Sequence, residues 1–167
     1  MNEVPRRQFA AAYRHPAFLL VDTWSGYRSS AYDPRGAQHL LPLDCSDADL
    51  GRAVLDALSR SHFFSDEEMD TTDFFHFDNR NRIYDAWVAK LMATRSLKTK
   101  RALFKDLDYV EITLRDGTIS FTPKHHVKLE AWEEVPGVAD LPVPVSRPPE
   151  EIGASLRRAF SLCTKPK

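Results

Sequence analysis

The feature that most constrains the fold is a pair of alternating segments joined by Asp116-Gly117. A two-residue Asp-Gly loop supplies the positive φ angles of a type I′ turn, whose twist matches that of paired antiparallel strands. The sequence therefore predicts a β-hairpin in which residues 110–115 pair with residues 118–122. Each strand has one apolar and one polar face, which is typical of an antiparallel sheet covered on one side. The alternating apolar residues are Val110, Ile112, Leu114, Ile119 and Phe121.

Three other segments have the apolar spacing of helices that bury one face. Ser46 precedes the first segment as an N-cap, and Asp47 and Asp49 suit the positive end of a helix. A second helix is expected from about Asn81 to Thr94. The third is expected after Pro148-Pro149, because proline is tolerated in a first helical turn. The apolar stripe of the first helix consists of Leu50, Ala53, Val54, Ala57 and Leu58.

The N-terminal part of the chain supplies one more strand. The run Ala17–Val21 is short and apolar, as in a strand buried on both faces. The stretch Asp22–Leu43 is rich in Ser, Gly, Pro and Tyr and is interpreted as irregular. With 167 residues, of which 43% are hydrophobic, the chain can bury a core of its own. We therefore expect a single domain over residues 1–167, of class α+β, with an antiparallel sheet and helices packed mainly on one face.

No catalytic signature is present in the sequence: there is no Gly-rich phosphate loop, no GxSxG elbow and no HExxH pair. The pair His125-His126, with Glu130 and Glu133 nearby, is the strongest candidate for a metal or general-base site. However, adjacent residues of an extended segment point to opposite faces, whereas zinc needs three or four converging ligands. We interpret one histidine as bonded to a backbone group and the other as solvated. We expect no catalytic residue, no metal and no cofactor.

The charge and the cysteines indicate where the protein resides. The formal net charge is −1, which does not favour binding to a membrane surface or directly to nucleic acid. Cys45 and Cys163 lie far apart, so a disulfide framework is not expected, and free thiols suit a reducing cytoplasm. The segment Met1–Arg14 lacks the apolar core of a signal peptide, and Ala17–Val21 is too short to span a bilayer. We expect a cytoplasmic protein.

Two charged clusters are candidates for binding a partner. The first is interleaved with phenylalanines and has six carboxylates but no Lys or Arg: Asp66, Glu67, Glu68, Asp70, Asp73 and Asp78. Residues 66–73 are here called the acidic segment. One interpretation is a solvated loop held by core aromatics. The other is a recognition surface whose carboxylates steer a basic partner. The second cluster lies within Arg95–Lys105 and is interpreted as a solvated connector. The candidate partner-binding residues of the acidic segment are Asp66, Glu67, Glu68, Asp70 and Asp73.

Three strings in the C-terminal half resemble one bacterial family, the immunity proteins of contact-dependent growth inhibition (CDI) systems. They are Thr99–Lys105, Pro123–Trp132 and Glu151–Phe160, within a resemblance that covers about residues 80–163. The resemblance implies an antidote that binds the cognate C-terminal toxin domain, often a nuclease, and blocks its active site or its access to substrate. These strings also contain core-type residues that would serve as scaffold: Leu103, Leu129, Trp132, Ile152, Leu156 and Phe160.

Two other function classes remain open at this point. One is a small metal-dependent hydrolase that uses His125, His126 and nearby carboxylates. The other is an RNA-binding regulator that uses the basic residues 95–105, whose affinity would fall steeply with salt.

Overall fold

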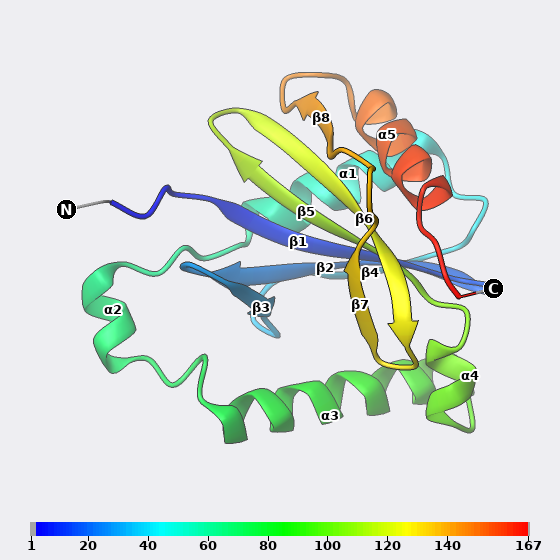
Figure 1. Ribbon diagram of the computed structural model, residues 1–167, viewed down its shortest axis with the longest axis horizontal. Helices are drawn as coiled ribbons and strands as arrows, with labels where there is room; N and C mark the ends of the chain where they lie inside the picture. Colours follow the sequence, from blue (N-terminus) through cyan, green and yellow to red (C-terminus); the bar gives the residue numbers. More distant parts are fainter. Residues whose placement is uncertain (1–2, 167) are drawn as a thin grey trace.

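The protein folds around one eight-stranded antiparallel sheet (Figure 1). The structure, a computed structural model, describes residues 3–166. The strands are β1 (Gln8–His15), β2 (Phe18–Gly26), β3 (Ser30–Tyr32), β4 (Gln38–Leu41), β5 (Asp108–Arg115), β6 (Thr118–Lys128), β7 (Ala131–Glu134) and β8 (Leu141–Pro144). The helices are α1 (Asp47–Ser59), α2 (Asp66–Thr71), α3 (Phe77–Thr94), α4 (Lys100–Phe104) and α5 (Pro149–Ser161). The strand order is β3-β2-β1-β5-β6-β7, with β4 also paired to β2 and β8 to β6. The predicted α+β class with an antiparallel sheet is confirmed.

The predicted hairpin is present as β5 and β6. Its register runs from Val110 opposite Pro123 to Arg115 opposite Thr118. Asp116 and Gly117 have φ angles of 50° and 76°, as a type I′ turn requires. The apolar side chains of this hairpin are fully buried at Val110, Ile112, Ile119 and Phe121.

Strands β1 and β2 are buried on both faces, and β1 lies between β2 and β5 in the sheet. The strand expected at Ala17–Val21 exists, but it continues to Gly26. The interpretation of Asp22–Leu43 as irregular was wrong, because this stretch completes β2 and also forms the short strands β3 and β4. Both short strands are held by backbone pairing with β2. Strands of three or four residues are too short for their side-chain pattern to predict such pairing.

The three predicted helices are confirmed as α1, α3 and α5. The hydroxyl of Ser46 caps α1 by accepting from the Asp49 amide at 3.0 Å. Helix α3 begins at Phe77, before the expected start near Asn81, and α5 begins at Pro149 as expected. Helices α1 and α5 lie so close together that a Cβ atom on Gly51 would come within 1.9 Å of the Pro149 carbonyl oxygen.

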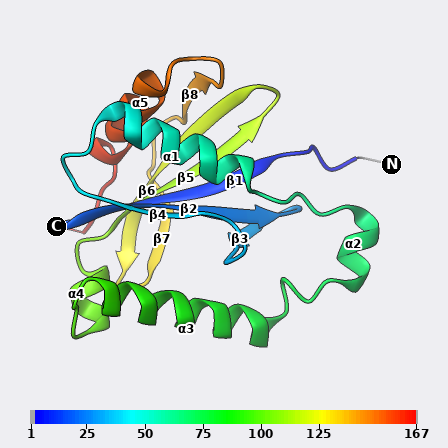
Figure 2. The same cartoon turned by 180° about the vertical axis from the view of Figure 1, so that it is seen from behind.

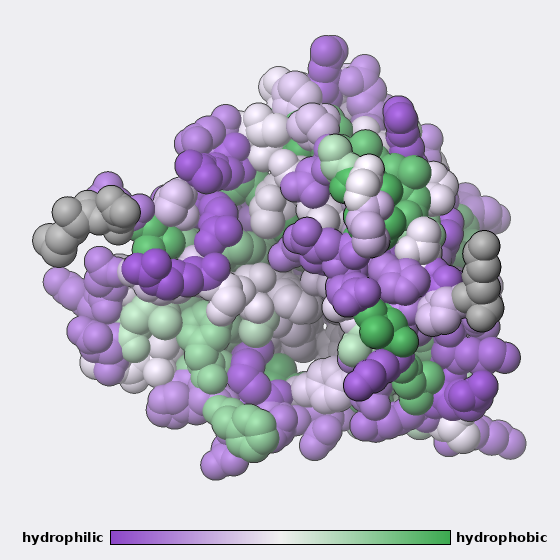
Figure 3. Space-filling model, in the orientation of Figure 1, coloured by the Kyte–Doolittle hydropathy of each residue, from purple (hydrophilic) through white to green (hydrophobic). Residues whose placement is uncertain are grey.

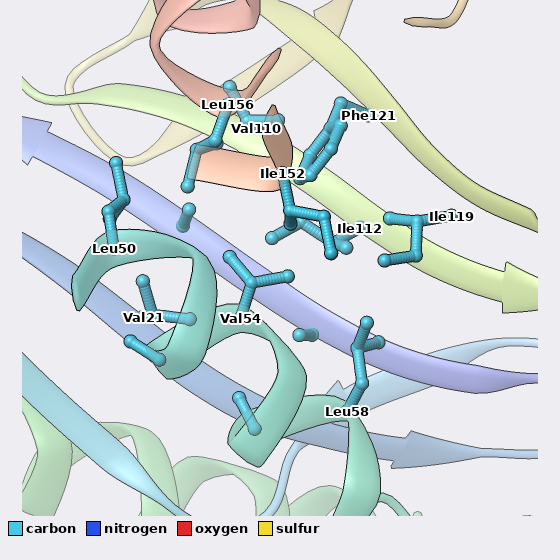
Figure 4. Packing of buried hydrophobic residues seen from close by; sticks show 14 of the residues in the cluster. Val21, Leu50, Val54, Leu58, Val110, Ile112, Ile119, Phe121, Ile152 and Leu156 are labelled. Atoms are coloured by element: carbon cyan, nitrogen blue, oxygen red, sulfur yellow. The ribbon is translucent and has the colours of Figure 1, made fainter. Parts of the chain in front are cut away.

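Helices cover both faces of the sheet. Figures 1 and 2 show α1 and α5 on one face, with α3 and α4 along the other. The first face packs closely: Leu50, Val54 and Leu58 of α1 point toward sheet residues such as Ile112 (Figure 4). The second face packs through larger side chains, including Trp87, Leu91 and Phe104. Of the three expected helices, α1 and α5 form the first cluster, whereas α3 packs with α4 on the opposite face. The expectation that helices lie mainly on one face was therefore wrong for α3. No helix within residues 3–166 is both long and apolar enough to cross a membrane.

Candidate functional site

The acidic segment forms the short helix α2 at one end of the molecule (Figure 1). Ser65 and Glu68 make a capping box: the Ser65 hydroxyl accepts from the Glu68 amide at 3.1 Å, and the Glu68 carboxylate accepts from the Ser65 amide at 2.7 Å. Asp66 and Glu67 add negative charge to the first turn, which favours the helix. The structure therefore holds these carboxylates on a defined helix rather than on a loop.

All five predicted partner-binding residues are exposed to solvent and lie on or just after α2. Two of them are engaged within the chain: Glu68 pairs with His62 at 3.0 Å, and Asp66 accepts a hydrogen bond from the Tyr27 hydroxyl. The hydrogen bond from the Ser65 amide, together with His62, lowers the pKa of Glu68 below its usual value. Within residues 3–166, no Lys, Arg or His lies within ion-pair distance of the other three carboxylates. These are Glu67, Asp70 and Asp73.

The phenylalanines around α2 mostly hold the acidic segment to the body of the protein. Phe64 and Phe74 are buried, with ring centroids 5.1 Å apart, and Phe75 packs edge-on against Phe74 at 4.8 Å. The Arg80 guanidinium of α3 lies over the Phe74 ring at 4.1 Å. Phe77 is different, since 77% of its surface is exposed. Core anchoring therefore explains Phe64 and Phe74, whereas Phe77 offers a large aromatic contact area beside the carboxylates.

The histidine pair points to separate partners. His125 Nδ1 lies 2.6 Å from the Thr164 hydroxyl, whereas the buried His126 has its Nε2 2.9 Å from the Leu129 carbonyl oxygen and must donate to it. The His126 ring also stacks on Trp132 at 4.6 Å. In the part of the chain that the structure describes, no three His, Cys, Asp or Glu side chains are grouped as metal ligands. The backbone bond expected for one histidine is made by His126.

The basic stretch is only partly a connector. Thr99 caps the short helix α4 by accepting from the Ala102 amide at 3.0 Å, and Leu103 and Phe104 are buried beneath it. Lys100 lies 3.4 Å from Glu130. Arg101 and Lys105 point to solvent.

The structure also contains an aromatic cleft that sequence reasoning missed. This cavity of about 390 Å³ lies between α3 and the sheet, where Figure 3 shows the molecule hollowed. Arg80 and Glu130 stand at the cleft, and Arg80 donates to the Tyr32 carbonyl oxygen at 2.9 Å. Arg80 also lies over the ring of Phe74, which directly follows the acidic segment. Arg80 therefore contacts both the cleft and the residues that anchor the acidic segment. The aromatic lining comes from five strands and α3: Tyr13, Trp24, Tyr32, Tyr109, Trp132, Tyr84 and Trp87.

A buried carboxylate lies behind one wall of the aromatic cleft. Asp22 of β2 has no exposed surface, and its Oδ2 accepts a hydrogen bond from the Trp87 indole nitrogen at 2.8 Å. Burial raises the pKa of Asp22 from 3.8 to about 7, against the opposing effect of the bond from Trp87. The Trp87 indole, which lines the cleft, is therefore hydrogen-bonded on its buried side to Asp22, whose pKa is raised to about 7.

Comparison with known proteins assigns the family. The family model for the CDI immunity protein matches residues 8–163. The immunity protein CdiI-YPIII of Yersinia pseudotuberculosis serotype O:3 (strain YPIII) is 41% identical over 98% of this chain and 99% of its own. The chain belongs to the CDI immunity protein family. The resemblance inferred from the three strings is confirmed, and the match extends through the N-terminal half as well.

Two solved structures share the fold of this family member. A chain of the CdiA-CT/CdiI toxin and immunity complex from Y. pseudotuberculosis superposes with a TM-score of 0.88 and 37% identity, covering 97% of this chain and 100% of that one. A Neisseria meningitidis protein of unknown function, NMB0488, matches with a TM-score of 0.90 and 37% identity over 98% of both chains.

The three family-like strings are mostly scaffold, as expected. Leu103, Ile152, Leu156 and Phe160 are buried in α4 and α5. Leu129 was wrongly assigned to the core: 37% of its surface is exposed, because it follows a register shift between His126 and Lys128 that ends the regular pairing of β6 with β7.

Proposed function

We propose that this chain is a cytoplasmic, non-enzymatic antidote that binds the C-terminal toxin domain of its own CDI system and blocks its active site or its access to substrate. Support comes from family membership over nearly the whole chain. The observation that carries the proposal is the TM-score of 0.88 with a chain of the Yersinia toxin and immunity complex. One immunity-protein domain spanning residues 1–167 is sufficient for this role.

The toxin in this proposal is a nuclease, and the acidic segment binds its basic substrate groove. A nuclease must neutralise phosphates, so its groove carries Lys and Arg side chains. Glu67, Asp70 and Asp73 are exposed and free of internal ion pairs, which leaves them available to such a groove. The capping box at Ser65 and Glu68 holds α2 in place before binding, which lowers the entropy lost in the complex.

The test replaces the three free carboxylates by amides: Glu67→Gln, Asp70→Asn and Asp73→Asn. This choice spares Asp66 and Glu68, whose hydrogen bonds hold the segment. The rate constant for association with the cognate toxin domain should fall several-fold at low salt, because these charges steer the encounter. The difference should shrink towards 1 M salt, where the Debye length is only ~3 Å.

A matched variant controls for total charge. Asp116→Asn, Glu133→Gln and Glu134→Gln remove the same number of carboxylates from exposed positions elsewhere. Association of this control should follow the wild type. Equal rates and equal salt dependence for the α2 variant and the wild type would show that the toxin docks on another surface.

The aromatic cleft is the second candidate docking surface, because a large apolar hollow with a few polar groups is typical of binding sites. Tyr84 is the wall residue to change, since 38% of its surface is exposed and its hydroxyl bonds Glu130 at 2.5 Å. If the cleft holds a toxin segment, Tyr84→Ala should speed dissociation and leave the salt dependence of association unchanged. A dissociation rate equal to that of the wild type would exclude Tyr84 from the interface.

A further inference from the structure

Two clusters of like charge lie on either side of α3 in the sequence, although the net charge is only −1. The acidic segment lies before α3 and the basic stretch lies after it (Figure 1). Helix α3 has 18 residues, so it separates the two by about 27 Å at a rise of 1.5 Å per residue. That is roughly three Debye lengths at physiological salt, where each is ~8 Å. The basic end therefore attracts anions almost independently of the carboxylates on α2.

The basic end is built from three parts of the chain that only the fold brings together. Arg101 and Lys105 come from α4 and its end, Lys128 ends β6, and Lys165 comes from the C-terminal tail. All four are exposed and surround a hollow of about 400 Å³. Lys165 lies 3.2 Å from Asp106. Within residues 3–166, the other three have no carboxylate within ion-pair distance.

The floor of this hollow is aliphatic. Val127 and Leu129 line it, with 38% and 37% of their surfaces exposed, among the few large apolar side chains so exposed within residues 3–166. Their positions are fixed by the register shift between His126 and Lys128 and by the bond from His126 to the Leu129 carbonyl. The exposure of Val127 and Leu129 is therefore a consequence of the backbone structure of β6 and the turn that follows it.

We propose that this basic end is a docking surface for an acidic protein segment that carries aliphatic side chains. An apolar centre with a charged rim is the usual anatomy of a protein interface. A nucleic acid fits less well, because single-stranded bases stack on aromatic rings. Among residues 3–166, the one aromatic ring that lines the hollow belongs to His126, which is 7% exposed and already stacked on Trp132. This surface is distinct from both candidate toxin-binding surfaces.

The probe is a fluorescein-labelled peptide of Glu-Glu-Leu repeats, and its binding to the full chain is followed by fluorescence anisotropy. The triple variant Arg101→Gln, Lys105→Gln and Lys128→Gln should weaken binding about tenfold, since each exposed ion pair contributes a factor of about two. Leu129→Ser should weaken it about threefold by removing the apolar contact. A peptide of Glu-Glu-Ser repeats should bind the wild type less tightly than the leucine peptide does.

The control variant Arg52→Gln, Arg115→Gln and Arg147→Gln removes three exposed cations from other parts of the surface. It should bind the leucine peptide as the wild type does. If both triple variants bind the leucine peptide equally weakly, the loss of affinity is due to total charge and the proposal is overturned. The proposal also fails if the leucine and serine peptides bind equally, or if neither binds. Tighter binding of an oligouridylate of equal charge, lost in the first variant, would identify a phosphate-binding surface instead. These outcomes leave the toxin-binding proposal untouched, because no toxin takes part.

Discussion

Replacing Asp22 by Asn should make the protein more stable at neutral and alkaline pH. The Asp22 carboxylate has no exposed surface, and the Trp87 indole donates to its Oδ2 at 2.8 Å. Burial penalises the ionised form and raises the pKa of Asp22 from 3.8 to about 7, while the bond from Trp87 and the charge of Lys90 act in the opposite direction. An Asn side chain keeps an oxygen that accepts from Trp87 but carries no charge.

The size of the effect follows from the pKa difference between the folded and unfolded chains. Asp22 is raised by about three units on folding, and each unit corresponds to about 1.4 kcal/mol, so the penalty is roughly 4 kcal/mol. Below about pH 4 the group is neutral in both states and there is no penalty. Between about pH 4 and pH 7 the folded chain keeps a proton that the unfolded chain releases, so the free energy of unfolding falls as pH rises.

The assay is urea unfolding of the wild type and Asp22→Asn from pH 4 to pH 8. The stability of the variant relative to the wild type should increase by roughly 4 kcal/mol across this range. Asp85→Asn is the control, because Asp85 is exposed on α3 and should show no such increase. A difference between Asp22→Asn and wild type that stays constant with pH would refute the reasoning. If the stability of Asp22→Asn relative to the wild type decreases as pH rises, the folded protein stabilises the ionised form of Asp22.

Two further predictions concern the histidine pair and the contact between α1 and α5. The double variant His125→Ala and His126→Ala should still protect cells from the toxin, although losing the stacking on Trp132 should lower the free energy of unfolding by about 1–2 kcal/mol. A folded double variant that fails to protect would give these residues a direct role. Gly51→Ala and Gly153→Ala should each destabilise the protein by about 2 kcal/mol or more, because the added Cβ would lie 1.9 Å from a backbone oxygen of the other helix. Unfolding midpoints equal to the wild type would show that the two helices can move apart freely.

Elements with strong local signals were predictable from the sequence. The hairpin follows from Asp116-Gly117 and its alternating flanks, and α1 follows from the Ser46 cap and one apolar stripe. In each case the information lies within a short stretch of chain. The five acidic residues could also be proposed from sequence as exposed, since a run of carboxylates without cations is seldom buried.

Elements that depend on distant partners were not predictable in the same way. Strand β1 contains the run Ala10–Ala12, which has low strand propensity, and it is central only because β2 and β5 pair with its two edges. The aromatic cleft gathers side chains from Tyr13 to Trp132, so no local window contains it. Leu129 was misassigned because its residue type suggests burial, whereas the register shift after His126 turns it to solvent.

The central claim is that this chain binds the toxin domain of its own CDI system. The most direct test is isothermal titration calorimetry of the purified chain into the purified cognate toxin domain. We expect saturable binding that ends at one chain per toxin domain and remains measurable at low micromolar concentrations. No heat of binding under these conditions, together with separate elution of the two proteins in size-exclusion chromatography, would contradict it.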